Sequence, residues 1–396
     1  MPTGRGFLHA TPLWASAFRP FYLLGATCGL ILMLVWFGAQ AGRWATPMAE
    51  LSPSIWHGHE MLFGFAAAII SGIVLTALPS WAGTEELTGG RLQALAGLWL
   101  AGRLAMLAPI PHVLAAIVDC ALFPAMAGLL LPQLLRVRNR YYLLLLPVLA
   151  GLFAGNVLFH AGRINADASL ASLGLRLAVH AIVFLYVLKG GVLTPIFTAN
   201  ALREKHRGGE ISFIPWLDVL ATASVVVLAI ADLARIPAVW VGSAALVACG
   251  VHAVRLARWQ GWRIADVPLL WVMHLGYAWL VVAFGLKAAA ELGGGLPEVT
   301  WVHAFTVGSL GLMMLGLMTR VVLRHTGRPL QVPRAMVIAY LLMLLAAVVR
   351  VEVPGIGLDS AYLMASSLLW MAPFAIYLAV FGAMLWSPSL PREVTK

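Results

Sequence analysis

Charged residues are scarce in this chain. Asp, Glu, Lys and Arg make up 11% of its 396 residues, whereas soluble globular proteins carry about 25%. Hydrophobic residues make up 61%, and the mean hydropathy is +0.90. A water-soluble fold of this length cannot hide so much apolar surface or solvate itself with so few charges. The composition excludes an ordinary soluble enzyme and a disordered protein, and it predicts an integral membrane protein.

Cysteine is almost absent. The three cysteines, Cys28, Cys120 and Cys249, all lie in apolar stretches, and no pair has C-x-x-C spacing. This pattern excludes a secreted disulfide scaffold and indicates neither a zinc knuckle nor an iron–sulfur site. A Walker motif, a glycine-rich dinucleotide loop and an evident internal repeat are also missing from the sequence. The chemistry therefore has to come from side chains inside the membrane domain or at its two faces.

Twelve apolar segments are long enough to span a bilayer, which takes about 20 helical residues. Pro, Gly or charged residues separate them. The predicted spans are residues 20–40, 58–81, 91–109, 112–135, 141–161, 170–198, 215–234, 238–257, 267–291, 301–323, 334–350 and 361–386. We expect an all-α, polytopic bundle of about 12 transmembrane helices, in which residues 1–396 form a single integral membrane domain without a large soluble domain.

Basic residues are unevenly distributed between the two ends of these spans. If the N-terminus is cytoplasmic, 18 of the 26 lysines and arginines fall on that side and five on the other; Arg103, Lys189 and Lys287 lie within spans. Cytoplasmic loops are normally enriched in Lys and Arg. Both termini are therefore predicted to be cytoplasmic. The net charge of +10 then reflects topology and contact with membrane lipids, and no nucleic-acid partner is expected.

Histidine supplies most of the potential chemistry within the spans. Ionisable side chains in a membrane helix are costly and usually face a cavity, a partner or a cofactor. Five of the eleven histidines fall near the outer ends of four predicted helices: His57, His59, His160, His180 and His303. Neutral imidazole suits haem iron, copper and zinc. These five are the candidate metal ligands, and a packing or relay role is the alternative for each.

The residues next to these histidines have predicted roles of their own. His57 and His59 are two residues apart, about 200° around an ideal helix, so one is expected to bind a cofactor and the other a second metal or a hydrogen-bond partner. Glu60 is the carboxylate that adjoins them, and it is the candidate catalytic proton relay. Asn156 lies one turn before His160 and is expected to orient it.

Two further residues are candidate cofactor contacts. Arg176 lies one turn before His180 and could pair with an acidic group of a cofactor; the alternative is an arginine at the membrane interface. On the inner side, His274 has Trp271 and Tyr277 nearby. A second haem or a quinol site would suit His274, and an interfacial anchor is its plainer interpretation.

Five stretches of the chain resemble the NnrS family of bacterial membrane proteins, which is linked to nitric oxide and denitrification. They are residues 12–24 (PLWASAFRPFYLL), 56–83 (WHGHEMLFGFAAAIISGIVLTALPSWAG), 190–200 (GGVLTPIFTAN), 269–280 (LLWVMHLGYAWL) and 303–330 (HAFTVGSLGLMMLGLMTRVVLRHTGRPL). The resemblance runs along nearly the whole chain. It implies a multi-pass protein of the bacterial inner membrane that contains haem, of the b type, and copper, and that helps cells withstand nitrosative stress. It does not define a reaction.

The first hypothesis is a haem–copper protein that binds nitric oxide or processes it by redox chemistry. Under it, His57 or His59, together with His303, would bind haem, and His160 and His180 would bind copper or face the haem iron. Turnover would need an electron donor, such as a quinol or a cytochrome, and whether the protein is a nitric oxide oxidoreductase stays open. A nitric oxide reductase-like enzyme would need a non-standard site, because the seventh predicted span contains no histidine.

Two other functions remain open from the sequence. Twelve spans with cytoplasmic termini are also a common layout of secondary transporters, with Pro124 and Pro195 as possible helix breaks. The candidate coupling residues are ionisable side chains within the spans: Asp119, Asp218, Asp232 and Lys287. Lys287 and Glu291 more simply form a stabilising pair one turn apart. The last alternative is an assembly or signalling partner of denitrification enzymes.

Overall fold

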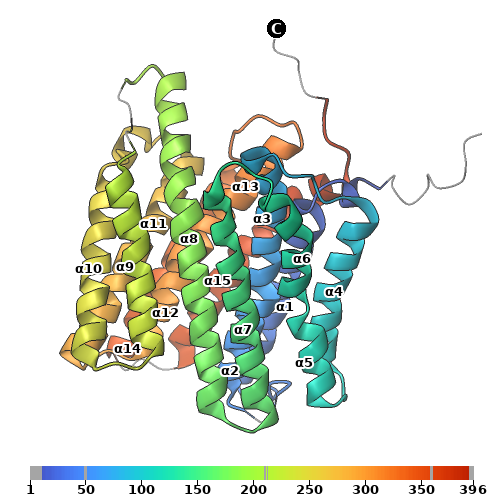
Figure 1. Cartoon of the computed structure of the whole chain (residues 1–396), viewed down its shortest axis with the longest axis vertical. Helices are drawn as coiled ribbons and strands as arrows, with labels where there is room; N and C mark the ends of the chain where they lie inside the picture. Colours follow the sequence, from blue (N-terminus) through green and yellow to red (C-terminus); the bar gives the residue numbers. More distant parts are fainter. Residues whose placement is uncertain (1–10, 49–50, 209–210, 212, 357–359, 392–396) are drawn as a thin grey trace, which may run out of the picture. The chain divides into compact units, whose positions relative to one another are not determined.

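Helices account for the regular structure of this protein. The computed structural model describes residues 11–48, 51–208, 211, 213–356 and 360–391, and these contain no strand. The α-helices are α1 (Phe18–Gln40), α2 (Pro53–His59), α3 (Ala67–Ala82), α4 (Gly89–Leu107), α5 (His112–Cys120), α6 (Leu122–Leu134), α7 (Leu145–Ile164), α8 (Ala168–Glu204), α9 (Pro215–Leu233), α10 (Ala238–Ala257), α11 (Pro268–Gly293), α12 (Glu298–His303), α13 (Leu312–His325), α14 (Arg334–Ile356) and α15 (Ser360–Trp386) (Figure 1). The prediction of an all-α protein is confirmed.

Eleven helical segments of the described chain are long and apolar enough to cross a membrane. Some join consecutive helices, as in Pro53–Ala82 and His112–Leu134. The remaining predicted span, residues 91–109, corresponds to α4, which is 19 residues long and contains Arg91 and Arg103. The predicted bundle of about 12 transmembrane helices is confirmed. The predicted cytoplasmic termini concern residues outside the described ranges, and their orientation stays a prediction.

Large apolar side chains cover the outside of α9 and α10. Val219 and Ile230 are 68% and 63% exposed, which suits contact with lipid. Trp216, at the start of α9, and Trp240, at the start of α10, are also exposed. The two helices follow each other through a short turn and pack together, so these tryptophans mark opposite ends of the pair. Aromatic residues at both ends are typical of helices that cross a membrane.

The two predicted proline breaks have different outcomes. The fourth predicted span is interrupted at Ala121, between α5 and α6. Pro124 has no N–H and cannot bond to the carbonyl of Cys120, so the helix is weakened at this point. In contrast, α8 continues through Pro195. The break at Ala121 matters for the site, because α5 ends one residue after the buried Asp119.

Two membrane segments contain a stretch of π-helix. One is η2 (Glu60–Ala66), which follows His59 at the end of α2, and the other is η5 (Ala304–Gly311), which follows His303 at the end of α12. Such wide helical turns are rare and occur mostly at functional sites. The hydrophobic pattern of the sequence does not predict them. Short 3-10 helices complete the fold: η1 (Pro12–Ala15), η3 (Arg140–Leu144) and η4 (Gly261–Ile264).

The chain divides into two compact units. Unit 1 consists of the described residues up to Ala181, Arg320–Leu330 and those from Phe374 onward, and unit 2 consists of Ile182–Thr319 and Gln331–Pro373. Within unit 1, α1 packs on α3, and α5 and α6 pack on α7. Within unit 2, α10 packs against α9 and α11 (Figure 1). The prediction of a single membrane domain stays a prediction.

Candidate metal centre

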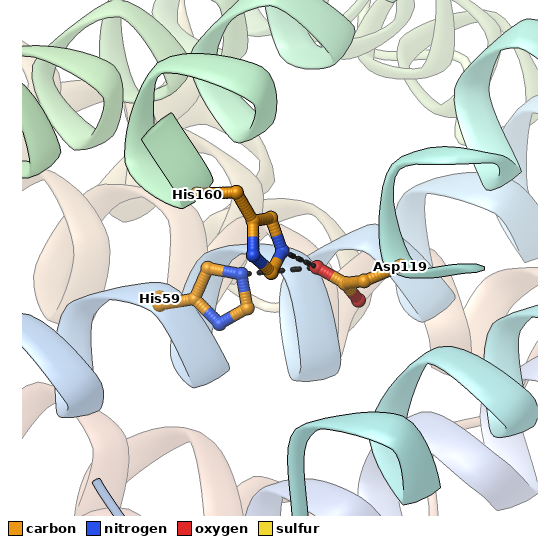
Figure 2. A group of neighbouring side chains, drawn as sticks. All are labelled: His59, Asp119 and His160. Atoms are coloured by element: carbon orange, nitrogen blue, oxygen red, sulfur yellow. Dashed lines mark hydrogen bonds and ion pairs between the residues drawn. The ribbon is translucent and has the colours of Figure 1, made fainter. Parts of the chain in front are cut away.

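Side chains from three helices of unit 1 meet around the carboxylate of Asp119. Asp119 lies in the last turn of α5, His59 is the last residue of α2, and Asn156 and His160 are one turn apart on α7. All four residues are at most 5% exposed. Figure 2 shows the two imidazole rings directed at the same carboxylate. A polar group of this kind inside a membrane protein is costly unless its members bind one another or a ligand.

Both histidines approach a single oxygen atom of Asp119. The Nε2 atoms of His59 and His160 lie 3.1 and 2.9 Å from Asp119 Oδ2 (Figure 2). Asn156 donates its Nδ2 to the same oxygen at 2.9 Å, and its Oδ1 lies 3.0 Å from His59 Nε2. One ligand atom from each of His59, Asp119 and His160 lies within 4.8 Å of the other two. Metal–ligand bonds of about 2.0–2.2 Å hold two ligand atoms at most about 4.4 Å apart, and the distances of 3.1 and 2.9 Å from Asp119 Oδ2 to the two Nε2 atoms lie within that limit.

Arg103 supplies the positive charge of the cluster. From α4 it donates Nη1 to Glu60 Oε2 at 2.8 Å and Nη2 to Asp119 Oδ1. All three side chains are buried. Two carboxylates therefore face one guanidinium, so the side chains joined by these bonds carry one excess negative charge when both imidazoles are neutral. Because an uncompensated charge is costly in a buried site, a further cation is expected here, as a proton on an imidazole or as a metal ion.

His59 meets oxygen atoms on both sides of its ring. Its Nδ1 lies 3.0 Å from Glu60 Oε1, and its Nε2 faces Asp119 and Asn156. A neutral imidazole has one N–H and one lone pair, so it satisfies only one of these two sides. A metal ion at Nε2 would leave the N–H at Nδ1 to donate to Glu60, which is how carboxylates commonly orient metal-binding histidines. The donor set therefore fits a compact cation.

His160 is held less firmly than His59. Its Nε2 contacts Asp119, but its Nδ1 is buried and has no hydrogen-bond partner within the described part of the chain. The ring is also positioned by edge contacts with the rings of His59 and Phe159, whose centroids lie 5.5 and 5.2 Å away. Of the two candidate histidine ligands, His59 is therefore oriented by hydrogen-bond contacts at both ring nitrogens, and His160 at one.

The surroundings of this cluster do not fit a haem. The ring of Phe159 stacks on His59 with a centroid separation of 3.8 Å, and the ring of Phe63 lies 5.1 Å away. A haem iron needs open space for the macrocycle around each axial nitrogen, whereas both Nε2 atoms here approach the same carboxylate oxygen. The cluster therefore suits a small ion, and a haem would have to be held elsewhere.

The other predicted ligands of unit 1 lie outside this group of three. His57 is half-buried and stacks on Trp36 with a centroid separation of 4.4 Å. His57 and His59 thus diverge, as their spacing predicts. His180 is buried on α8, one turn after the half-buried Arg176. Cofactor binding by His57, His180 and Arg176 stays a prediction.

The two remaining candidates belong to unit 2. His303 Nδ1 lies 2.9 Å from the carbonyl oxygen of Val299, and Arg350 Nη2 donates to His303 Nε2 at 3.2 Å. His274 Nε2 lies 2.9 Å from Thr198 Oγ1. Haem binding by His303 and His274 likewise stays a prediction.

The sequence points to His59, Glu60 and His160 but does not predict that Asp119 and Arg103 join them. Asp119 is predicted to be a coupling residue of a transporter, whereas its carboxylate is the centre of the cluster. No role is predicted for Arg103, whereas it joins Glu60 to Asp119. The sequence does contain a signal for this contact: Arg103 and Asp119 are 16 residues apart and lie in consecutive predicted spans. Basic and acidic residues within membrane helices usually pair, so an ion pair between these two is the expected arrangement.

Asn156 does not make the predicted contact with His160. Its side chain contacts His59 and Asp119, whereas the sequence predicted that it orients His160. The reason is geometric, since the carboxylate of Asp119 lies within hydrogen-bond distance of both α7 residues and takes the place that the histidine would occupy.

The predicted coupling residues of unit 2 are held in ion pairs. Lys287 Nζ lies 2.6 Å from Asp232 Oδ1 and 2.7 Å from Glu291 Oε1, so the predicted pair of Lys287 and Glu291 is confirmed. Arg255 Nη2 lies 2.6 Å from Asp218 Oδ1. Because each carboxylate already has a basic partner, these contacts favour a role in holding α9, α10 and α11 together.

The fold and the buried cluster define a polytopic, α-helical membrane protein with a histidine–carboxylate centre. Residues 12–389 match the NnrS protein family. The match covers nearly the whole chain, and the protein belongs to the NnrS family. No curated protein matches it. Family membership is consistent with a membrane protein of the nitric oxide response.

Proposed function

We propose that the protein holds a copper ion at His59, Asp119 and His160, and that this centre binds nitric oxide. The observation that carries the proposal is the convergence of three ligand atoms within 4.8 Å in a buried, negatively charged cluster. Two imidazoles and a carboxylate suit copper, zinc and non-haem iron, and the family resemblance favours copper. When bound, copper would supply a coordination position for nitric oxide and a one-electron redox couple.

The side chains around the three ligands hold them in place. Arg103 and Asn156 contact different oxygen atoms of Asp119, which restricts the rotation of its carboxylate. Glu60 contacts His59 Nδ1 and fixes the plane of that ring. Ligands held in this way keep their geometry without the ion, which favours binding because little has to be ordered. We infer that Glu60 positions His59, in addition to its predicted role as a proton relay.

Burial of the cluster suits a gaseous ligand. His59, Asp119 and His160 are at most 5% exposed, so hydrated ions and polar substrates would have to lose their water to reach them. Nitric oxide is uncharged and small, and it dissolves in hydrocarbon. It can therefore approach from the membrane between apolar side chains, while charged competitors are kept out by the cost of desolvation.

The proposal is tested by nitric oxide binding to purified, copper-loaded protein in detergent. We expect about one copper ion per chain and an absorption spectrum that changes with nitric oxide. Asp119→Asn and His160→Ala should lose both properties, whereas His206→Ala, in an exposed loop, should keep them. A folded protein that takes up no copper, or a copper spectrum that is the same in His160→Ala, would contradict the proposal. The electron donor for any redox turnover stays a prediction.

A further inference from the structure

Two membrane segments, in different parts of the sequence, have the same order of helical elements. The first is α2, η2 and α3, and the second is α12, η5 and α13. Each has an α-helix that ends at a histidine, then a π-helix, then a longer α-helix. His59 and His303 are 244 positions apart, and this shift brings the boundaries of the three elements into agreement within one residue. π-helices are rare, so their matching positions indicate a common origin.

The same shift pairs identical residues at the points where the chain changes direction or packs closely. The pairs are Pro53 and Pro297, His59 and His303, Gly64 and Gly308, Gly72 and Gly316, and Gly83 and Gly327. Gly83 and Gly327 follow the ends of their helices and have φ values of +68° and +74°, a left-handed conformation that favours glycine. The shared residues are few: four of the five pairs are Pro or Gly, and the fifth is the pair of histidines.

The paired glycines also make equivalent contacts with the preceding long helix. A Cβ atom at Gly72 would lie 2.8 Å from the Tyr22 ring of α1, and a Cβ atom at Gly316 would lie 2.9 Å from Val272 Cγ1 of α11. In both cases the absence of a side chain lets two helices approach closely. Tyr22 and Val272 are 250 positions apart, close to the shift of the glycines.

A second pair of glycines makes the reverse contact. Gly25 of α1 faces Ile69 of α3, and Gly276 of α11 faces Met313 of α13. Ile69 and Met313 are again 244 positions apart. The close contacts of α1 with α3, in unit 1, thus have counterparts between α11 and the first turns of α13, in unit 2.

The next helix of each segment brings an arginine to the histidine end. In unit 1, Arg103 of α4 bonds to Glu60, which follows His59. In unit 2, Arg350 of α14 donates to His303 Nε2 at 3.2 Å. Each copy thus consists of a long helix, a helix with a π-segment after its histidine, and a helix with an arginine that reaches that position.

We propose that α1–α4 and α11–α14 are two copies of one duplicated unit, and that His303 and Arg350 form a second binding site, which takes an anionic oxygen group. The counterpart of Glu60 is Ala304, so the second copy lacks that carboxylate. Arg350 donates a hydrogen bond to His303. Within the described residues, no carboxylate forms an ion pair with Arg350. At His59 the bonded groups have an excess of negative charge, which suits a cation, whereas at His303 the bonded partner is the positively charged Arg350.

The geometry of an arginine favours an oxyanion as the ligand. The guanidinium offers several N–H donors in a planar fork that matches two oxygens of one group. Two sources share this chemistry: a free inorganic oxyanion, such as nitrite or phosphate, and the phosphate of an anionic phospholipid headgroup. The site does not depend on the copper centre, because its residues belong to a different unit.

The experiment uses full-length protein and has one arm for each source. In detergent, binding of nitrite or phosphate is followed by its effect on the thermal unfolding temperature. In nanodiscs, retained lipid is counted by native mass spectrometry with phosphatidylglycerol, and with phosphatidylcholine as the uncharged control. Arg350→Gln should weaken binding about tenfold or more, since a charged hydrogen bond is lost, and Arg235→Gln, at an exposed arginine, should not.

Loss of nitrite or phosphate binding in Arg350→Gln would support a free oxyanion, and loss of retained phosphatidylglycerol alone would support the headgroup. If Arg350→Gln does not fold, Arg350→Lys keeps the charge without the planar fork and should weaken binding to a smaller degree. Wild-type protein that binds none of these probes, or equal binding by wild type and a folded Arg350 variant, would overturn the proposal. Neither result depends on copper, so this test and that of the copper centre fail separately.

Discussion

The Nε2 atom of His160 lies 2.9 Å from Oδ2 of Asp119, across a sequence separation of 41 residues. This contact depends on the break at Ala121, because α5 ends there and Asp119 lies in its last turn. The carboxylate then lies within reach of α7 and α2. The interruption of the helix thus places a buried carboxylate beside two imidazoles. Several consequences of this arrangement can be measured.

Arg103 should be essential for stability. Its replacement by Gln leaves the carboxylates of Glu60 and Asp119 buried without their countercharge, and breaking a buried pair in this way costs about 3–5 kcal/mol. We expect a lower thermal unfolding temperature in detergent for Arg103→Gln. Adding Glu60→Gln to that variant removes one unpaired charge and should recover part of the loss. An unchanged unfolding temperature in Arg103→Gln would show that the ion pairs do not stabilise the fold.

Glu60→Gln should weaken copper binding without abolishing it. The carboxylate orients His59 but is not one of the three ligands, and loss of such a contact typically lowers metal affinity about 10–100-fold. Competition with a copper chelator measures the affinity, and Glu85→Gln, in an exposed loop of the same unit, is the matched control. Equal affinities in wild type and Glu60→Gln would remove the orienting role. If the protein turns over nitric oxide, an unchanged rate in Glu60→Gln would also remove the relay role.

Gly72→Ala and Gly316→Ala should destabilise the protein to a similar extent. An added methyl group meets Tyr22 in one case and Val272 in the other, and overpacking of this kind costs about 1–3 kcal/mol. Gly97→Ala in α4 is the control, because nothing lies within 4 Å of a Cβ atom there, and Ala is a better helix former than Gly. Thermal unfolding compares the three variants. If Gly316→Ala behaves like the control while Gly72→Ala unfolds early, the packing of the two copies is not equivalent.

The loop at Asp266 should depend on pH. The contacts of Arg207 and Lys205 hold the pKa of Asp266 well below its usual value. The stabilisation is therefore complete above the ordinary pKa of an aspartate and is lost as the pH falls through the lowered value. Hydrogen exchange of residues 261–267, corrected for its intrinsic pH dependence, should become faster on acidification. Asp266→Asn should remove this pH dependence. If hydrogen exchange depends on pH in the same way in the wild type and in Asp266→Asn, the titration of Asp266 does not stabilise the loop.

The sequence predicts the helices well because apolar length is a local property. Segments such as α1 and α9 begin and end within a few residues of their predicted bounds. The site is harder to predict because it depends on contacts between distant helices. Periodicity shows that His57 and His59 diverge, but only the fold shows that His59 is the one that meets Asp119 and His160.

Two other features could not be predicted for a different reason. The π-helices have no signature in the hydrophobic pattern. Each hydrogen bond of a π-helix spans one residue more than in an α-helix, and over one or two turns this hardly changes which residues share a face. The duplication is hidden because most positions in a membrane helix accept any apolar residue, so the two copies diverge freely. Apart from the pair His59 and His303, the identical residues are glycines and prolines, such as Gly83 and Gly327, whose left-handed conformation favours glycine.

X-ray absorption at the copper edge tests the central claim most directly. Copper-loaded wild-type protein should show two imidazole ligands and an oxygen donor, and His160→Ala should lose one imidazole, while His206→Ala keeps both. A copper environment that is the same in wild type, His160→Ala and Asp119→Asn would contradict the proposed centre, because the ion would then be bound by other residues.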